Sequence, residues 1–130
     1  MIDRRRQELQ LLETTYGELE IGPTIDWVVI KRWQLPPGWN KTETAVLVLI
    51  PGGYPITPPD NFCTDNDLRL ANGALPGSSS PNQQHIGQQW LQFSYGHIEA
   101  GDWHPDADLL QGHNLLTFLL GVTKRLAEAN

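Results

Sequence analysis

The chemistry that this 130-residue chain can support depends first on Cys63, its only thiol. Thiol transfer needs an exposed thiolate whose pKa is lowered by a cation, a helix N-terminus or a nearby base. The surrounding sequence N-F-C-T-D supplies none of these, and Asp60 and Asp65 would raise the pKa of the thiol. A free cysteine among aromatic and β-forming residues is usually a small buried apolar side chain. These residues favour a structural Cys63, with a nucleophilic Cys63 as the alternative.

Histidines are the other side chains suited to acid–base or metal chemistry, and the chain has four of them: His85, His97, His104 and His113. No two of them have the i,i+4 spacing of a helical metal motif, and no carboxylate cluster joins them. We therefore expect no metal site and no cofactor. His85 lies in a stretch of turn-forming residues and is the best general-base candidate, because its unperturbed pKa is near neutrality. A solvated loop histidine is the simpler alternative.

Composition and charge narrow the class of protein. The formal net charge of -6 argues against binding to nucleic acid. No apolar run has membrane-spanning length and no signal-peptide pattern is present, which predicts a cytoplasmic protein that does not contact a membrane. A single cysteine excludes an internal disulfide and a cysteine-rich zinc site. The length of 130 residues predicts a single domain, residues 1–130.

The elements that must position these side chains follow from hydrophobic periodicity and turn signals. The pattern predicts a helix over residues 2–16, strands over 18–21, 25–35, 44–50 and 62–64, and a final helix over 107–127. Alternation along a strand places Phe62 and Cys63 on opposite faces. Asp106 is the predicted N-cap of the final helix. Residues 65–89 show turn signals and no sustained period, which predicts a long loop.

Residues 51–62, which read P-G-G-Y-P-I-T-P-P-D-N-F, follow the most apolar predicted strand and hold four of the ten prolines. Proline fixes φ and removes a hydrogen-bond donor, so this segment can neither continue the strand nor begin a helix. Composition alone would give a proline-rich surface loop. The apolar residues at both ends predict instead a stiff, extended crossing. We expect at least one cis X-Pro bond, with Tyr54-Pro55 the favoured position.

The spacing Tyr54-Pro55-x-x-Pro58-Pro59 directly after a strand resembles the Y-P-x-x-P-P signature of the ubiquitin-conjugating (E2, or UBC) fold. The resemblance implies an α+β architecture: an N-terminal helix, an antiparallel meander of about four strands, the proline-rich crossing and a C-terminal helix. E2 enzymes usually carry two further helices after this point, so the fold would be a shortened one.

Later segments add to the resemblance. Pro81-Asn82 is similar to the end of the family's His-Pro-Asn motif, and Trp103-His104-Pro105 is similar to its W-S-P element. Trp103 is therefore expected to be buried, bracing the sheet against the final helix. More closely, four segments resemble the bacterial group called prokaryotic E2 family E: P-P-D-N-F, then residues 67–73, 87–90 and 103–108.

This resemblance implies an E2-like component of a bacterial ubiquitin-like conjugation pathway, with antiphage defence as a setting. The implied partners are an E1-like adenylating protein, a ubiquitin-like or multi-ubiquitin protein and a JAB-type protease. The first helix is where E1 docks in E2 proteins, which makes Arg4, Arg5 and Arg6 candidates for binding E1 or the modifier. From the residues alone, these arginines form a solvated helix face.

The sequence departs from the family at its catalytic position. Alignment on Pro81-Asn82, with Ser80 in place of the motif's histidine, puts Trp90 where the E2 cysteine should be, and indole cannot form a thioester. One hypothesis is an active E2 with Cys63 as a displaced nucleophile, His85 as base and Asn82 supporting the oxyanion. The other is a catalytically silent E2 variant, or an RWD-type binding module. A buried Cys63 would favour the binding module and an exposed one the enzyme.

Overall fold

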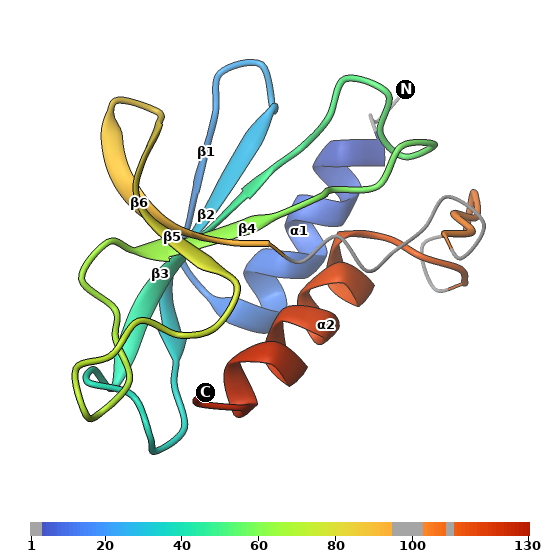
Figure 1. The fold of residues 1–130 in the computed structure, drawn as a ribbon. Helices are drawn as coiled ribbons and strands as arrows, with labels where there is room; N and C mark the ends of the chain where they lie inside the picture. Colours follow the sequence, from blue (N-terminus) through green and yellow to red (C-terminus); the bar gives the residue numbers. More distant parts are fainter. Residues whose placement is uncertain (1–3, 95–102, 109–110) are drawn as a thin grey trace.

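The computed structural model describes residues 4–94, 103–108 and 111–130, and its fold is α+β (Figure 1). The elements are α1 (Arg4–Tyr16), β1 (Leu19–Ile21), β2 (Trp27–Gln34), β3 (Glu43–Leu49), β4 (Phe62–Asp65), β5 (Ser79–His85), β6 (Gln88–Phe93) and α2 (Leu115–Ala127). The first predicted helix and the first four strands are present, although residues 2–3 lie outside the described part. None of the helices in the described part is long and apolar enough to cross a membrane.

The strands form one antiparallel sheet in the order β1-β2-β3-β4-β6-β5. β1 to β4 are the predicted meander, whereas the expected strand number was too low because β5 and β6 add a hairpin. Residues 79–93 had been predicted largely as loop. β5 reads S-S-P-N-Q-Q-H and has no buried residue, so it lacks the apolar alternation by which a strand is recognised. A register shift between Ser80 and Gln83 accommodates Pro81.

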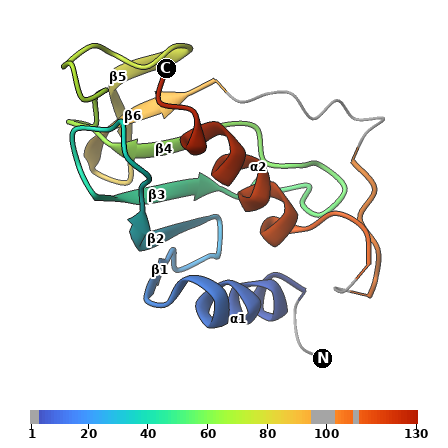
Figure 2. The same cartoon turned by 90° about the horizontal axis from the view of Figure 1, so that it is seen from below.

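The two helices lie side by side, with α1 next to β1 (Figure 2). Their apolar side chains, such as Leu12 and Leu119, share one core with alternate residues of the sheet, including Val46 and Phe62. The other face of the sheet carries a second, smaller buried cluster: Val29, Leu47, Cys63 and Trp90. Phe62 and Cys63 therefore point to opposite faces, as predicted from strand alternation.

The final helix begins at Leu115, eight residues later than predicted. Its N-cap is Asn114, which forms a capping box with Thr117, and not Asp106. Asp106 instead accepts a hydrogen bond from the backbone nitrogen of Asp108, and Gly112 at φ 65° pairs with Pro105. These turns occupy the described part of the predicted first two helical turns; residues 109–110 lie outside it.

The proline crossing joins β3 to β4 and contains the predicted cis Tyr54-Pro55 bond. Tyr54 and Trp103 are both buried, with ring centroids 6.3 Å apart. Trp103 Nε1 donates a hydrogen bond to the carbonyl oxygen of Pro55 over 2.7 Å, and its ring stacks on His113. Trp103 thus fixes the crossing against the segment that leads into α2, and its predicted burial is confirmed.

Candidate functional site

Cys63 lies in the middle of the sheet, paired with Leu47 of β3 on one side and Gln92 of β6 on the other. Its side chain points away from the helices and is 2% exposed. Burial raises the pKa of the thiol to about 12, because a thiolate loses its hydration there. The direction agrees with the sequence prediction, but the cause is burial and not the neighbouring aspartates. In this state the sulfur is a neutral thiol and a poor nucleophile.

His85, the last residue of β5, is brought to Cys63 through a third side chain, Gln92. His85 Nε2 and Gln92 Oε1 are 2.8 Å apart, and the Cys63 thiol donates to the same oxygen over 3.9 Å. An amide oxygen only accepts hydrogen bonds, so Nε2 of His85 carries a proton in this arrangement. His85 consequently cannot use Nε2 to remove the thiol proton.

A shallow depression on the sheet surface collects these three side chains beside the proline crossing. Its lining includes Leu49, Pro51, Thr57, Pro58, Cys63, His85 and Gln92. Most of the lining surface is apolar, and Asp60 and Asn61 also line the depression. Gln92 was missed by the sequence reasoning; the only signal was its place two residues beyond Trp90, which puts both side chains on the same face as Cys63.

Trp90, which stands where the family's cysteine was expected, lies on β6 opposite Asp65. The indole is 2% exposed and belongs to the same cluster as Cys63, Leu47 and Val29. Its Nε1 donates to the carbonyl oxygen of His85 over 3.0 Å. Trp90 therefore fills the open face of the sheet and holds the end of β5 against it.

Asn82 is not brought to Cys63. It is exposed at φ 63°, and its side chain and backbone exchange two hydrogen bonds with Asn66, of 2.9 and 2.8 Å. It does not line the depression that holds Cys63. These contacts tie β5 to the residue that follows β4, which is a structural role for the irregular Pro81-Asn82 part of the strand.

The three N-terminal arginines differ in what they contact. Arg4 Nε pairs with buried Glu8 over 2.9 Å. Arg5 donates to the backbone oxygens of Ile25 and Pro51 over 2.8 and 2.9 Å. Arg6 is exposed and lines a groove between α1 and β1. Two of the three predicted binding residues thus have contacts within the chain, and Arg6 is the exposed one.

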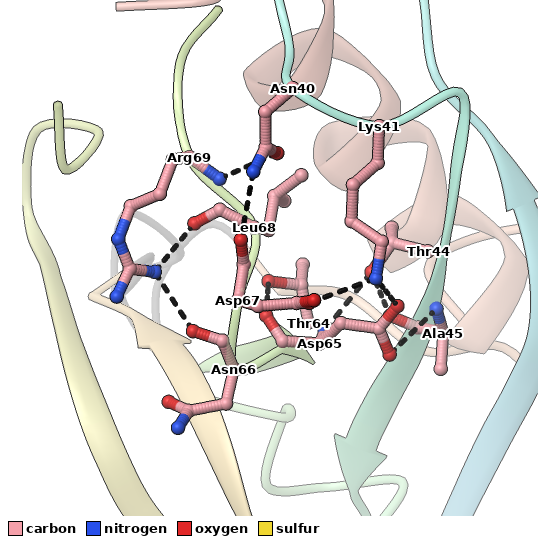
Figure 3. A network of polar contacts seen from close by, with 10 residues as sticks. All are labelled: Asn40, Lys41, Thr44, Ala45, Thr64, Asp65, Asn66, Asp67, Leu68 and Arg69. Carbon is pink, nitrogen blue, oxygen red and sulfur yellow. Dashed lines mark hydrogen bonds and ion pairs between the residues drawn. The ribbon is translucent and has the colours of Figure 1, made fainter. Parts of the chain in front are cut away.

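A polar network lies at the far end of β4 from the proline crossing (Figure 3). Lys41 Nζ is 2.8 Å from Asp65 Oδ2 and 2.8 Å from Asp67 Oδ1. The hydrogen bond from Lys41 lowers the pKa of Asp67. Asn40 donates to the carbonyl oxygen of Asp67 and accepts from the backbone of Arg69. The network attaches the β2–β3 loop to the segment after β4, where sequence reasoning had assigned no contacts to these residues.

Of the remaining histidines, His104 and His113 lie in the described residues and contact each other. His113 Nδ1 accepts a hydrogen bond from the backbone nitrogen of His104 over 2.8 Å, and His97 lies outside the described residues. Within the described ranges, no group of three or more histidine, cysteine or acidic side chains could hold a metal ion.

Comparison with known proteins gave one family. The model of prokaryotic E2 family E matches residues 1–129, nearly the whole chain. No curated protein and no solved structure matched the chain.

Proposed function

The chain belongs to prokaryotic E2 family E, and from this membership we propose that it serves a bacterial ubiquitin-like conjugation pathway as a positioning component. In this role it binds the modifier or its activating protein without forming a thioester of its own. The partners that fit are an E1-like adenylating protein and a ubiquitin-like or multi-ubiquitin protein, with a JAB-type protease in the same cytoplasmic pathway.

The burial of Cys63 is the observation that carries the non-covalent role. Thioester transfer requires the sulfur to approach a carbonyl carbon of another protein, and the thiol is 2% exposed and out of reach in this conformation. Its pKa of about 12 also leaves almost no thiolate at neutral pH. The buried Trp90, at the position predicted for the E2 cysteine, supplies no alternative nucleophile.

A second function, an active E2 that is charged on Cys63, is favoured by the depression that Cys63 shares with His85. In that reaction the Cys63 thiolate attacks the thioester carbonyl of the charged E1-like protein. The new thioester forms on Cys63 and the E1 thiolate leaves. His85 Nε2 and the thiol both contact Gln92 Oε1 and not each other, so this reaction needs His85 to move.

A charging reaction separates the two functions. The purified protein is mixed with ATP and with the E1-like and ubiquitin-like proteins of its pathway, and the products are resolved on a non-reducing gel. We expect no reductant-sensitive adduct, together with a stable complex of the protein with the E1-like protein or the modifier, and the same complex from Cys63→Ala.

The outcomes that contradict the proposal are distinct. A reductant-sensitive adduct that disappears in Cys63→Ala and becomes reductant-resistant in Cys63→Ser would establish the active E2, because serine would give an ester. If no adduct appears and no complex forms, the pathway assignment is wrong. The variant Arg6→Ala tests whether the groove between α1 and β1 binds a partner. It should weaken the complex without changing the melting temperature of the protein.

A further inference from the structure

The tip of the β5–β6 hairpin is folded back over the sheet face that lacks helices. Trp90 Nε1 donates to the backbone oxygen of His85, and the His85 imidazole reaches Gln92. Ile86 lines a second depression together with Trp27 of β2. β2 is separated from β5 by three strands in the sheet order, so the tip extends across the face of the sheet.

His85, where β5 meets the tip of the hairpin, lies beside Cys63 in the depression next to the proline crossing. Cys63 lines this depression together with His85 and Gln92, and its thiol donates to Gln92 Oε1, the oxygen that His85 also contacts. β5 is an edge strand that pairs with β6 alone, and none of its residues is buried. Ile86 is at φ 46°, a conformation that costs a β-branched residue stability. Segments with these properties open at lower free energy than the core of the same protein.

We propose that residues 85–88 form a strap that closes over Cys63 and opens locally, while the core beneath the helices stays folded. Two hydrogen bonds hold the closed state: the one between His85 and Gln92, and the one from Trp90 Nε1 to the carbonyl oxygen of His85. Opening exposes the thiol on the face opposite the helices, and a partner that displaces the strap would present Cys63 to solvent. The inference goes beyond the proposed function and is measured without any pathway protein.

The test is the rate at which Cys63 reacts with an aromatic disulfide reagent under native conditions. The thiol loses its proton to the buffer, the sulfur attacks the reagent, the reagent's S–S bond breaks, and one half leaves as a coloured thiolate. Cys63 is the only thiol, so the colour reports this residue alone. We expect His85→Ala to react about fivefold faster, the factor that corresponds to losing one hydrogen bond of ~1 kcal/mol.

Two further measurements distinguish local opening from unfolding. Gln84→Ala, a neighbouring exposed change on the same strand, should leave the rate unchanged, whereas Gln92→Leu, which removes the shared acceptor, should raise it as His85→Ala does. For the unmodified chain the rate should stay constant at low denaturant, because local opening exposes little surface.

Unchanged rates in both His85→Ala and Gln92→Leu would overturn the strap. So would a rate in the unmodified chain that rises with denaturant in step with global unfolding, whatever the variants do. If His85→Ala proves unfolded, Gln92→Leu and the denaturant series decide the question.

Discussion

The carboxylate of Glu8 on α1 accepts a hydrogen bond of 2.6 Å from the backbone nitrogen of Leu115, the first residue of α2. Glu8 is 1% exposed, and it also pairs with Arg4 and accepts from the hydroxyl of Tyr54 in the proline crossing. One buried side chain therefore joins both helices and the crossing. A buried charge is tolerated only with such a complete set of partners.

Removal of this carboxylate should be strongly destabilising. We expect Glu8→Ala to lower the free energy of unfolding by about 3–5 kcal/mol, because it leaves the buried partners unsatisfied. Glu8→Gln retains an acceptor and should cost less. Denaturant unfolding measures both, with the exposed Glu13→Ala on the same helix as the control, expected within about 0.5 kcal/mol of the unmodified chain. An equal, small effect of all three would show that Glu8 is hydrated.

Trp103→Ala should lower the free energy of unfolding by about 3–5 kcal/mol, because it removes a buried aromatic side chain and leaves a cavity beneath the crossing. Trp27→Ala is the matched control, since Trp27 is only partly buried on the open face of the sheet. Thermal unfolding should show a much smaller shift for Trp27→Ala. Equal shifts would mean that Trp103 does not fix the crossing.

The parts of the fold that were predicted correctly are those in which a local sequence pattern matches the pattern of buried residues. The alternation that separates Phe62 from Cys63 and the proline spacing around Tyr54 both depend on neighbours along the chain, and both were right. β5 was missed because its residues are polar and its position comes from pairing with β6. The start of α2 was missed because Asn114 and Thr117 form its capping box. Asparagine and threonine are also common in turns, so these residue types alone do not mark the start of a helix.

The candidate site was less predictable, since its geometry depends on long-range packing. Sequence reasoning could name Cys63 and His85 but not the glutamine between them, because Gln92 meets His85 only when the hairpin folds back over the sheet. Glu8 and Lys41 contact partners that are farther away in sequence, such as Leu115 and Asp65. Such contacts follow from the assembled fold and not from any local period.

Ile86→Asn should stabilise the protein. Ile86 and Gly87 both have positive φ in the two-residue turn between β5 and β6, as in a type I′ turn, where Asn-Gly is the preferred pair. We expect the free energy of unfolding to rise by about 0.5–1 kcal/mol as the strain on a β-branched residue is relieved. Ile56→Asn, at an exposed position of the crossing, is the control and should have no effect. A loss of stability in Ile86→Asn alone would show that apolar packing of Ile86 outweighs the strain.

The two aspartates that pair with Lys41, Asp65 and Asp67, should contribute unequally to the stability of the fold. Asp65 is 32% exposed and also accepts from the backbone nitrogen of Ala45, whereas Asp67 is 77% exposed. Asp65→Asn should therefore lower the free energy of unfolding by about 1 kcal/mol and Asp67→Asn by only about 0.3 kcal/mol. Chemical denaturation at low and high salt checks this, since the Asp67 contribution should vanish at high salt. A larger effect of Asp67→Asn would reverse the assignment.

The burial of Cys63 predicts a loss of stability in alkali. The thiol ionises near pH 9.0 when unfolded and near 12 in the fold, so between these values unfolding releases a proton. Stability from the neutral thiol is complete below pH 9.0 and declines as pH rises toward 12, by at most about 1.4 kcal/mol per pH unit. Tyr54, whose pKa burial also raises, adds its own decline above pH 10.0. Between pH 9.0 and pH 10.0, the unfolding free energy of Cys63→Ala should therefore fall less steeply with pH than that of the unmodified chain. Identical profiles would mean that the thiol is hydrated, which would restore Cys63 as a candidate nucleophile.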